Sequence, residues 1–397
     1  MKITSVDVFL LRPAVSHSTY PSKPVMCRIN TDEGISGLGE AGIFTGIGEH
    51  AVFGMLQDMA PLVIGRDPMD NEVLWEEIKN ILYGHCSGGG VIVFSGMSAL
   101  DTAMMDIKGK ALGVPCYKLL GGKQNQKLRC YASHIECGWA EDLAPRGSAR
   151  EYADVAERVM NLGYDMVKCD FIAYDRDKQP LSRRQTAHEL SKRAVMKLAE
   201  ERLCAIRERC GEGMEILIEN LCRLDICGSL EMDRLARKYD CLLMEECLDP
   251  FRPGNLKVVR DKAVTPLAAG EKVQTRWGYS KYFEEQTLRI IQPDLTNCGG
   301  LSETKKVCDM AHVYDVKVQA HAAGTPFAVA AALQLETAIP NFSVHEHLFS
   351  NDHPEIKSYC KYSYDPVDGY VSVPELPGIG NELSEQAVRE AQCLTIR

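Results

Sequence analysis

The chain has 397 residues, of which 45% are hydrophobic and 25% are charged, and it carries a net charge of −10. This balance argues against nucleic acid and an anionic membrane surface as partners, because both bind through clustered positive charge. The sequence has no apolar run long enough to span a bilayer, and its sixteen cysteines are scattered, so we expect a cytoplasmic protein with reduced thiols and not a disulfide scaffold.

Residues 1–126 are predicted to form an α+β domain. Antiparallel strands are expected within residues 1–60, because ITSVDVFLL and VMCRINT alternate between apolar and polar positions and DEGISGLGEA carries turn glycines. Helices are expected within residues 66–120, where apolar residues recur every three or four positions. Strands that are followed by helices in this way favour a separate α+β layer.

Residues 127–350 are predicted to form a parallel barrel. Short apolar runs alternate there with amphipathic stretches, and eight such units follow one another, which is the pattern of a (β/α)7–8 TIM-like barrel. A doubly wound sheet is disfavoured because no G-x-G-x-x-G motif follows the first strand. Residues 351–397 lack this rhythm, and their stretch DPVDGYVSVPELPGIGNEL is expected to pack back on the N-terminal domain.

Polar residues close the apolar runs of the predicted barrel. Catalytic groups of a parallel barrel lie at the carboxyl ends of its strands, so these residues are candidates for one shared site. In chain order they are Ser133 and His134, Lys168 and Asp170, Glu219, Glu245, Glu271, Asp294, His321 and Glu346.

Three glutamates in this series predict a metal site. Glu219, Glu245 and Glu271 follow one another at equal intervals of one βα unit, so they belong to neighbouring strands. Three converging carboxylates cannot all stay ionised without a cation. Hard oxygen ligands favour Mg²⁺, with Mn²⁺ as the alternative.

His321 is the predicted catalytic base. Asp294, one strand earlier, can accept a hydrogen bond from one imidazole nitrogen, which fixes the tautomer and raises the basicity of the ring. A nearby metal would stabilise the charge that develops on a substrate carboxylate when the α-proton leaves. The combination predicts proton abstraction next to a carboxylate.

Several longer segments carry a family resemblance over nearly the whole chain. They are DEGISGLGE (32–40), SALDTAMMDIKGKALGVPCYKLLGG (98–122), LLMEE, LAAGE, IIQPD, VQAHAAGTPFAVA and DGYVSVPELPGIG (368–380). On these segments the sequence resembles the enolase superfamily, in its mandelate racemase-like branch. The resemblance implies that the N-terminal region and the C-terminal tail form a capping domain, with lids near residues 17–24 and 41–50 that select the substrate.

Several positions depart from the family pattern. The first metal ligand is usually Asp but is Glu219 here, and Leu221 stands where several sugar-acid dehydratases have a His that protonates the leaving hydroxyl. The racemase pattern has two lysines on the second strand, whereas this chain has Lys168 and Asp170, as in dehydratase-like members. Cys247 replaces the proline of a Glu-Glu-Pro motif. These departures disfavour a two-base racemase.

The resulting hypothesis is a Mg²⁺-dependent dehydratase of a sugar acid, either an aldonate or an aldarate. His321, oriented by Asp294, would remove the α-proton, and the β-hydroxyl would leave as water to give a 2-keto-3-deoxy acid. The leaving hydroxyl would take its proton back from His321 or from another group. Further expected site residues are Lys168 and Asp170 in catalysis and Glu346, His134 and Tyr20 in substrate binding, with His134, Asp170 and Tyr20 also candidates for the acid.

Two other functions stay open. The same enediolate chemistry would serve an epimerase, a racemase or another lyase of a carboxylic acid. The off-pattern residues Glu219, Leu221 and Cys247 would also fit a regulator that binds metal and acid without turnover. The expected partner is in each case a small carboxylic acid, which the sequence does not specify, and a homo-oligomer is expected because families of this kind commonly assemble.

Overall fold

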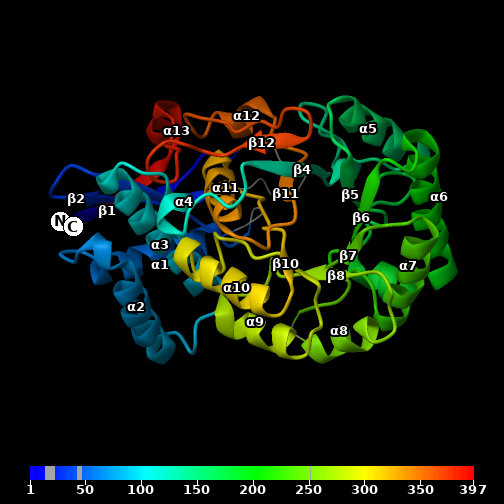
Figure 1. The fold of residues 1–397 in the computed structure, drawn as a ribbon, viewed down its shortest axis with the longest axis horizontal. Helices are drawn as coiled ribbons and strands as arrows, with labels where there is room; N and C mark the ends of the chain where they lie inside the picture. Colours follow the sequence, from blue (N-terminus) through cyan, green and yellow to red (C-terminus); the bar gives the residue numbers. More distant parts are fainter. Residues whose placement is uncertain (14–22, 43–46, 251) are drawn as a thin grey trace.

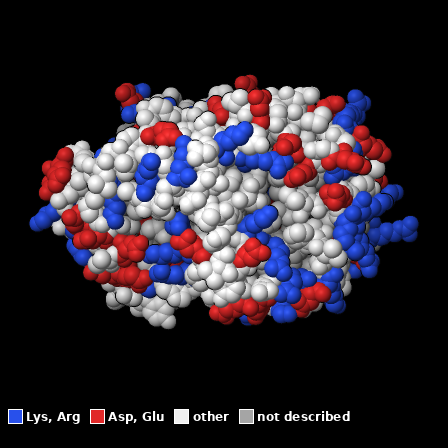
Figure 2. Space-filling view, viewed as in Figure 1, with Lys and Arg blue, Asp and Glu red and all other residues white. Residues whose placement is uncertain are grey.

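The computed structural model describes residues 1–13, 23–42, 47–250 and 252–397. Figure 1 shows two parts side by side, with a ring of strands and helices on the right and a smaller α+β layer on the left that holds both chain termini. Among the described residues, no helix combines the length and the apolar character that crossing a bilayer requires. Figure 2 shows acidic and basic side chains interspersed over one face of the molecule.

The smaller part is a four-stranded antiparallel sheet covered by helices. The strand order β13-β1-β2-β3 places the last strand of the chain beside the first, so the C-terminal segment returns to the N-terminal region. The helices and one face of the sheet share a buried apolar core. The elements are β1 Ile3–Leu10, β2 Val25–Thr31, β3 Ser36–Ala41, α1 Glu49–Met59, η1 Ala60–Leu62, η2 Pro68–Asp70, α2 Asn71–His85, α3 Val91–Leu112, α4 Cys116–Leu119 and β13 Gln392–Ile396.

The expectation that residues 1–60 form strands alone is wrong, because α1 occupies Glu49–Met59. Val52, Phe53, Leu56 and Met59 are buried at helical spacing on this helix. The helix follows Gly48, which provides no side-chain cap for the first amides, so the sequence lacks the usual signal for a helix start.

The larger part is a curled parallel sheet of eight strands in the order β10-β9-β8-β7-β6-β5-β4-β11. A parallel bridge between Val318 and Phe342 brings β10 back to the segment that leads into β11, which closes the ring. The predicted TIM-like barrel is thereby confirmed. Its strands are β4 Lys127–Ser133, β5 Met166–Asp170, β6 Glu215–Glu219, β7 Leu243–Glu245, β8 Leu267–Ala269, β9 Ile290–Ile291, β10 Lys317–Val318 and β11 His345–Leu348.

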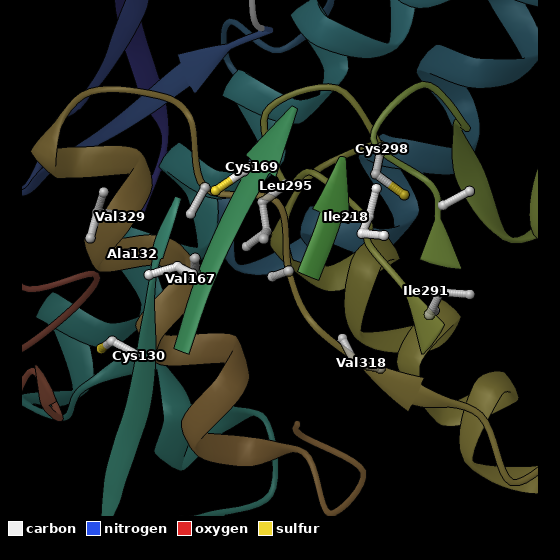
Figure 3. Close-up of a cluster of buried hydrophobic side chains, with 14 of the residues drawn as sticks. Cys130, Ala132, Val167, Cys169, Ile218, Ile291, Leu295, Cys298, Val318 and Val329 are labelled. Carbon is white, nitrogen blue, oxygen red and sulfur yellow. The ribbon is translucent and has the colours of Figure 1, made fainter. Parts of the chain in front are cut away.

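Helices surround this sheet and pack on the outward side chains of its strands. Figure 3 shows part of the layer between them, where Cys130, Ala132, Val167 and Cys169 lie among other small apolar residues. The cysteines of the chain are free, and many serve as small core residues. The remaining elements are η3 Ile135–Cys137, α5 Ala149–Asn161, η4 Gln185–Glu189, α6 Lys192–Cys210, α7 Ile226–Lys238, α8 Pro253–Arg260, α9 Thr275–Glu284, α10 Leu301–Val313, α11 Pro326–Ala338, α12 Pro354–Lys357, β12 Tyr370–Ser372 and α13 Glu385–Glu390.

Buried polar side chains of the smaller part bind the N-terminal ends of the helices that follow two barrel strands. Asp101 on α3 accepts hydrogen bonds from the Ser302 hydroxyl and from its backbone N–H, the latter at 2.9 Å. Glu40 on β3 accepts hydrogen bonds from the backbone N–H and the hydroxyl of Thr325, at 3.0 and 2.6 Å. Ser302 follows β9 and Thr325 follows β10, so the smaller part is fixed over the barrel mouth as a capping domain.

Gly39 on β3 allows α3 to pack directly against the sheet. A methyl group added at Gly39 would lie 1.9 Å from the carbonyl oxygen of Ala99 on α3, so backbone would have to move. We expect Gly39→Ala to lower the free energy of unfolding by at least about 2 kcal/mol, as overpacking does. Gly213→Ala, where the added methyl group meets open space, should change it by less than about 0.5 kcal/mol. Urea denaturation of both variants tests this, and equal effects would contradict it.

Candidate active site

The site is formed by side chains that alternate between the two faces of each barrel strand. One layer inside the barrel is apolar and consists of Tyr131, Met166, Leu217, Leu243, Ala268, Ile290 and Val344. Because alternate side chains of a strand share a face, the residues two positions further along point into the same space at the carboxyl end. These residues are mostly polar, and they are Ser133, Lys168, Glu219, Glu245, Gly270, Gln292 and Glu346.

Lys168 lies at the centre of this polar layer. Its Nζ is 2.5 Å from Glu245 Oε1, 3.0 Å from Glu346 Oε1 and 3.3 Å from Glu219 Oε2, and all four side chains are buried. Burial alone would lower the pKa of Lys168, but Glu245 and Glu346 raise it well above its usual value. The side chain is therefore a permanent ammonium that compensates the charge of three carboxylates.

Glu219 and Glu245 are in direct contact. Burial and the neighbouring Glu219 raise the pKa of Glu245 well above its usual value. Backbone amides fix the other end of Glu219, because Asn220 N and Leu221 N donate to its Oε1 at 2.9 and 2.7 Å. Leu221 and Cys222 both have a positive φ, so the chain turns around this carboxylate directly after β6.

Glu271 faces two cationic side chains. Its carboxylate contacts Lys272 Nζ, and its Oε2 lies 3.3 Å from His321 Nε2. Within the described residues, no group of three or more His, Cys, Asp or Glu side chains is arranged so that it could hold a metal ion. The distribution of partners accounts for this, since Glu219 and Glu245 turn to Lys168 whereas Glu271 turns to Lys272 and His321.

Two features of the glutamates still fit a divalent cation. Glu219 Oε2 is buried and accepts no hydrogen bond from the described residues, although the Lys168 ammonium is nearby. The contacting carboxyl groups of Glu219 and Glu245 need either a shared proton or a shared cation. Their donor atoms are hard oxygens, which suit Mg²⁺. The metal site at Glu219, Glu245 and Glu271 thus stays a prediction that the donor chemistry supports.

His321 and Asp294 form a close pair. His321 Nδ1 lies 2.7 Å from Asp294 Oδ2, while Asp294 Oδ1 accepts hydrogen bonds from Thr296 N at 2.7 Å and the Thr296 hydroxyl at 2.5 Å. This network holds the carboxylate still and directs His321 Nε2 to the mouth, beside Glu271. Burial lowers the pKa of His321, but Glu271, Glu346 and Asp294 together raise it to about 10.

The other predicted site residues have distinct surroundings. Asp170 is buried and bound to Arg223 Nε at 2.8 Å and to Ile172 N at 2.9 Å. Glu346 accepts hydrogen bonds from the Ser133 hydroxyl at 2.7 Å and from Ala322 N at 3.0 Å, in addition to its ion pair with Lys168. His134 follows β4 and lies 2.8 Å from Glu136. Tyr20, most of the predicted lid at residues 17–24 and residues 43–46 of the predicted lid at 41–50 lie outside the described residues.

Several polar residues of the site were not predicted, among them Lys272 beside Glu271, Thr296 beside Asp294, Gln292, Glu136 and Arg223. Gln292 donates through Nε2 to Glu245, and the alternation from Ile290 would have placed it in the polar layer. Glu136 and Arg223 come from the loops after β4 and β6, where no strand period applies. Their positions relative to His134 and Asp170 follow only from the folded loops.

Two family descriptions match the chain. Residues 5–121 match the N-terminal domain of mandelate racemase and muconate lactonizing enzyme, and residues 151–387 match the enolase C-terminal domain-like family. The first match covers most of the capping domain, and the second covers most of the barrel together with much of the C-terminal segment.

Named relatives and a solved structure resemble the chain over most or all of its length. The D-xylonate dehydratase of Haloferax volcanii is 30% identical over 92% of this chain and 84% of its own length. The D-galactonate dehydratase of Ralstonia nicotianae is 28% identical over 98% of this chain and 94% of its own. The crystal structure of a member of the enolase superfamily from Salmonella Typhimurium has a TM-score of 0.94 and 41% identity, and each chain is covered to 100%.

Loss of Lys168 should leave buried carboxylates without their cation. We expect Lys168→Met to lower the free energy of unfolding by about 3–5 kcal/mol at pH 8 in EDTA. The loss should shrink toward pH 5, because the raised pKa of Glu245 makes the folded state bind protons that the unfolded state does not. Urea titrations at both pH values measure this. Lys197→Met, which removes an exposed ammonium 3.9 Å from Glu201, should cost less than about 1 kcal/mol at either pH.

Proposed function

The chain belongs to the enolase superfamily, in its mandelate racemase branch, and we propose that it is a hydro-lyase that removes water from a sugar acid. The His321–Asp294 pair carries the proposal, because it places one oriented imidazole beside the carboxylates of the barrel mouth. The names of the relatives support the reaction class, since they include D-xylonate and D-galactonate dehydratases. We propose an aldonate or aldarate as substrate and a 2-keto-3-deoxy acid as product.

His321 would act as the base. Its Nε2 faces the mouth beside Glu271, the carboxylate that does most to raise the pKa of the ring to about 10. With Glu271 taken up by a cation that pKa would fall, and the neutral Nε2 would take the proton from the carbon next to the substrate carboxylate. Asp294 holds Nδ1 at 2.7 Å, which keeps the ring oriented and stabilises the imidazolium that forms. Lys168 keeps Glu219, Glu245 and Glu346 in place through this charge change, because its ammonium contacts all three.

Glu219, Glu245 and Glu271 would hold Mg²⁺ in this proposal. When bound, the cation would supply Lewis acidity that stabilises negative charge on the substrate carboxylate. Lys272 and His321 now neutralise Glu271, so the Glu271 side chain would have to exchange one of these partners to take up its role.

The second strand argues against the epimerase alternative. A two-base epimerase needs a second proton-transfer group across from His321, and the racemase pattern has a lysine at the position of Asp170. Here Asp170 is buried, bound to Arg223 at 2.8 Å and capped by Ile172 N. A carboxylate with these partners is poorly placed to return a proton to carbon, which favours elimination.

The dehydration proposal is tested by keto-acid release. Purified enzyme with Mg²⁺ should convert D-xylonate, D-galactonate or another member of an aldonic and aldaric acid panel. His321→Asn should lower kcat by about 10²–10⁴-fold, which is the usual contribution of a general base. His312→Asn is the matched control, because His312 is exposed near the end of α10, and it should leave kcat unchanged.

Two results would replace this proposal. Exchange of the α-proton with deuterated solvent and no keto acid would indicate an epimerase. Calorimetric binding of an acid with neither exchange nor product would indicate a regulator.

The metal proposal has its own readout. Calorimetry should detect Mg²⁺ binding to the wild-type protein, and Glu245→Gln and Glu271→Gln should each weaken it by at least tenfold, because each removes a charged oxygen ligand. Glu284→Gln, an exposed change at the end of α9, should have no effect. Equal Mg²⁺ affinity in all of these proteins would rule out the predicted ligand set.

A further inference from the structure

A second pair of histidine and carboxylate lies at the barrel mouth. His134 Nδ1 is 2.8 Å from Glu136 Oε1, which is nearly the same separation as between His321 Nδ1 and Asp294 Oδ2. The two pairs belong to the ends of β4 and of β9 and β10. Since β11 lies between β4 and β10, the two histidines follow the strands on either side of the one that carries Glu346.

The backbone at His134 is bent in an unusual way. His134 has φ +57, a left-handed conformation that few residues other than glycine adopt. It directly follows Ser133 of the polar layer and precedes η3, so the bend interrupts the alternation of the strand. Residues held in such conformations are concentrated at functional sites.

Glu136 is a buried hydrogen-bond partner of His134. Its side chain is 2% exposed, and its Oε2 accepts no hydrogen bond from the described residues. A buried carboxylate is costly unless it compensates a charge. His134 supplies one such charge beside the more distant Arg223, because burial lowers the pKa of His134 but Glu136 raises it further, so the net shift is upward.

His134 is open toward the site on its other side. Its side chain is 15% exposed, and the described residues offer its Nε2 no hydrogen-bond partner, whereas Nδ1 is bound to Glu136. His134 directly follows Ser133, whose hydroxyl donates a hydrogen bond to Glu346 in the polar layer at 2.7 Å, and Lys168 and Glu219 of that layer act on His134 electrostatically. An oriented imidazole with one free N–H beside the mouth is able to donate a proton to a bound molecule.

We propose that His134, oriented by Glu136, is the general acid that protonates the departing β-hydroxyl. The assignment rests on the proposed dehydration. It gives this chain a proton donor although Leu221 has no acidic side chain and Asp170 is bound to Arg223.

The proposed step balances with two imidazoles. The Cα–H bond breaks, its proton goes to His321 Nε2, and its electron pair forms the bond between Cα and Cβ. The Cβ–O bond breaks, and the hydroxyl takes the Nε2 proton of His134 and leaves as water. The enol that remains gains a proton at Cβ and loses its hydroxyl proton, which gives the 2-keto-3-deoxy acid. Proton exchange with solvent restores both histidines.

A substrate with a different leaving group separates acid catalysis from all other roles. In the 3-deoxy-3-fluoro analogues of D-xylonate and D-galactonate, fluoride departs as an anion and needs no proton. We expect His134→Asn to lower keto-acid release from the hydroxy acid by about 10²–10⁴-fold. The same variant should release fluoride from the analogue at a rate within about threefold of the wild-type enzyme, which also shows that it is folded.

Companion variants complete the experiment. Glu136→Gln should lower keto-acid release by about 10–100-fold, as loss of a histidine's partner does, and should also keep fluoride release. His321→Asn should lose both reactions, because the base is needed for either leaving group. His312→Asn should keep both.

The possible outcomes distinguish the inference from the proposed function. If His134→Asn keeps keto-acid release, or loses fluoride release in parallel, His134 is not the acid although dehydration stands. If the wild-type enzyme releases keto acid from no acid of the panel and no fluoride from the analogues, the proposed dehydration itself is wrong and the assignment of His134 is wrong with it.

Discussion

The concentration of buried carboxylates at the barrel mouth is the constraint on which the site depends. Strand alternation forces Glu219, Glu245 and Glu346 into one space, and burial makes their joint ionisation costly. Lys168 offsets part of this cost by contacting all three, and burial and Glu219 raise the pKa of Glu245, which favours a proton on that carboxyl group. The charge of Glu271 remains available for a ligand. A cation bound there would offset the carboxylate that does most to raise the pKa of His321.

The longest segment that resembles the family, residues 98–122, connects the smaller part to the barrel and takes no part in the proposed reaction. Asp101 and Asp106, both within residues 98–122, are buried on α3. Asp101 binds the first turn of α10, the helix after β9, through Ser302, and Asp106 accepts hydrogen bonds from Leu38 N at 3.0 Å and Ile379 N at 2.8 Å. One helix thereby connects the barrel, the cap sheet and the C-terminal segment, and it fixes the cap relative to the mouth.

The fold could be predicted where the pattern of apolar residues shows which parts of the chain are buried. Strands that are covered on both faces appear as apolar runs, so all eight barrel strands were found, whereas α1 was missed because Gly48 gives no capping signal. The contact between His321 and Asp294 was predicted from the order of the strands. Gln292 could have been predicted as well, because it lies two residues after Ile290 and therefore shares its face of the strand. Glu136 could not be found, because its approach to His134 depends on a left-handed bend that no strand or helix period encodes.

The two departures after β6 are one structural change. Glu219 is longer than the usual Asp, and its carboxylate curls back to accept hydrogen bonds from the amides of Asn220 and Leu221. The contact accompanies a left-handed turn at Leu221 and Cys222, and position 221 contributes its backbone N–H to it. With Glu219 as the first glutamate, the proton donor has to come from another strand, and β4 presents one.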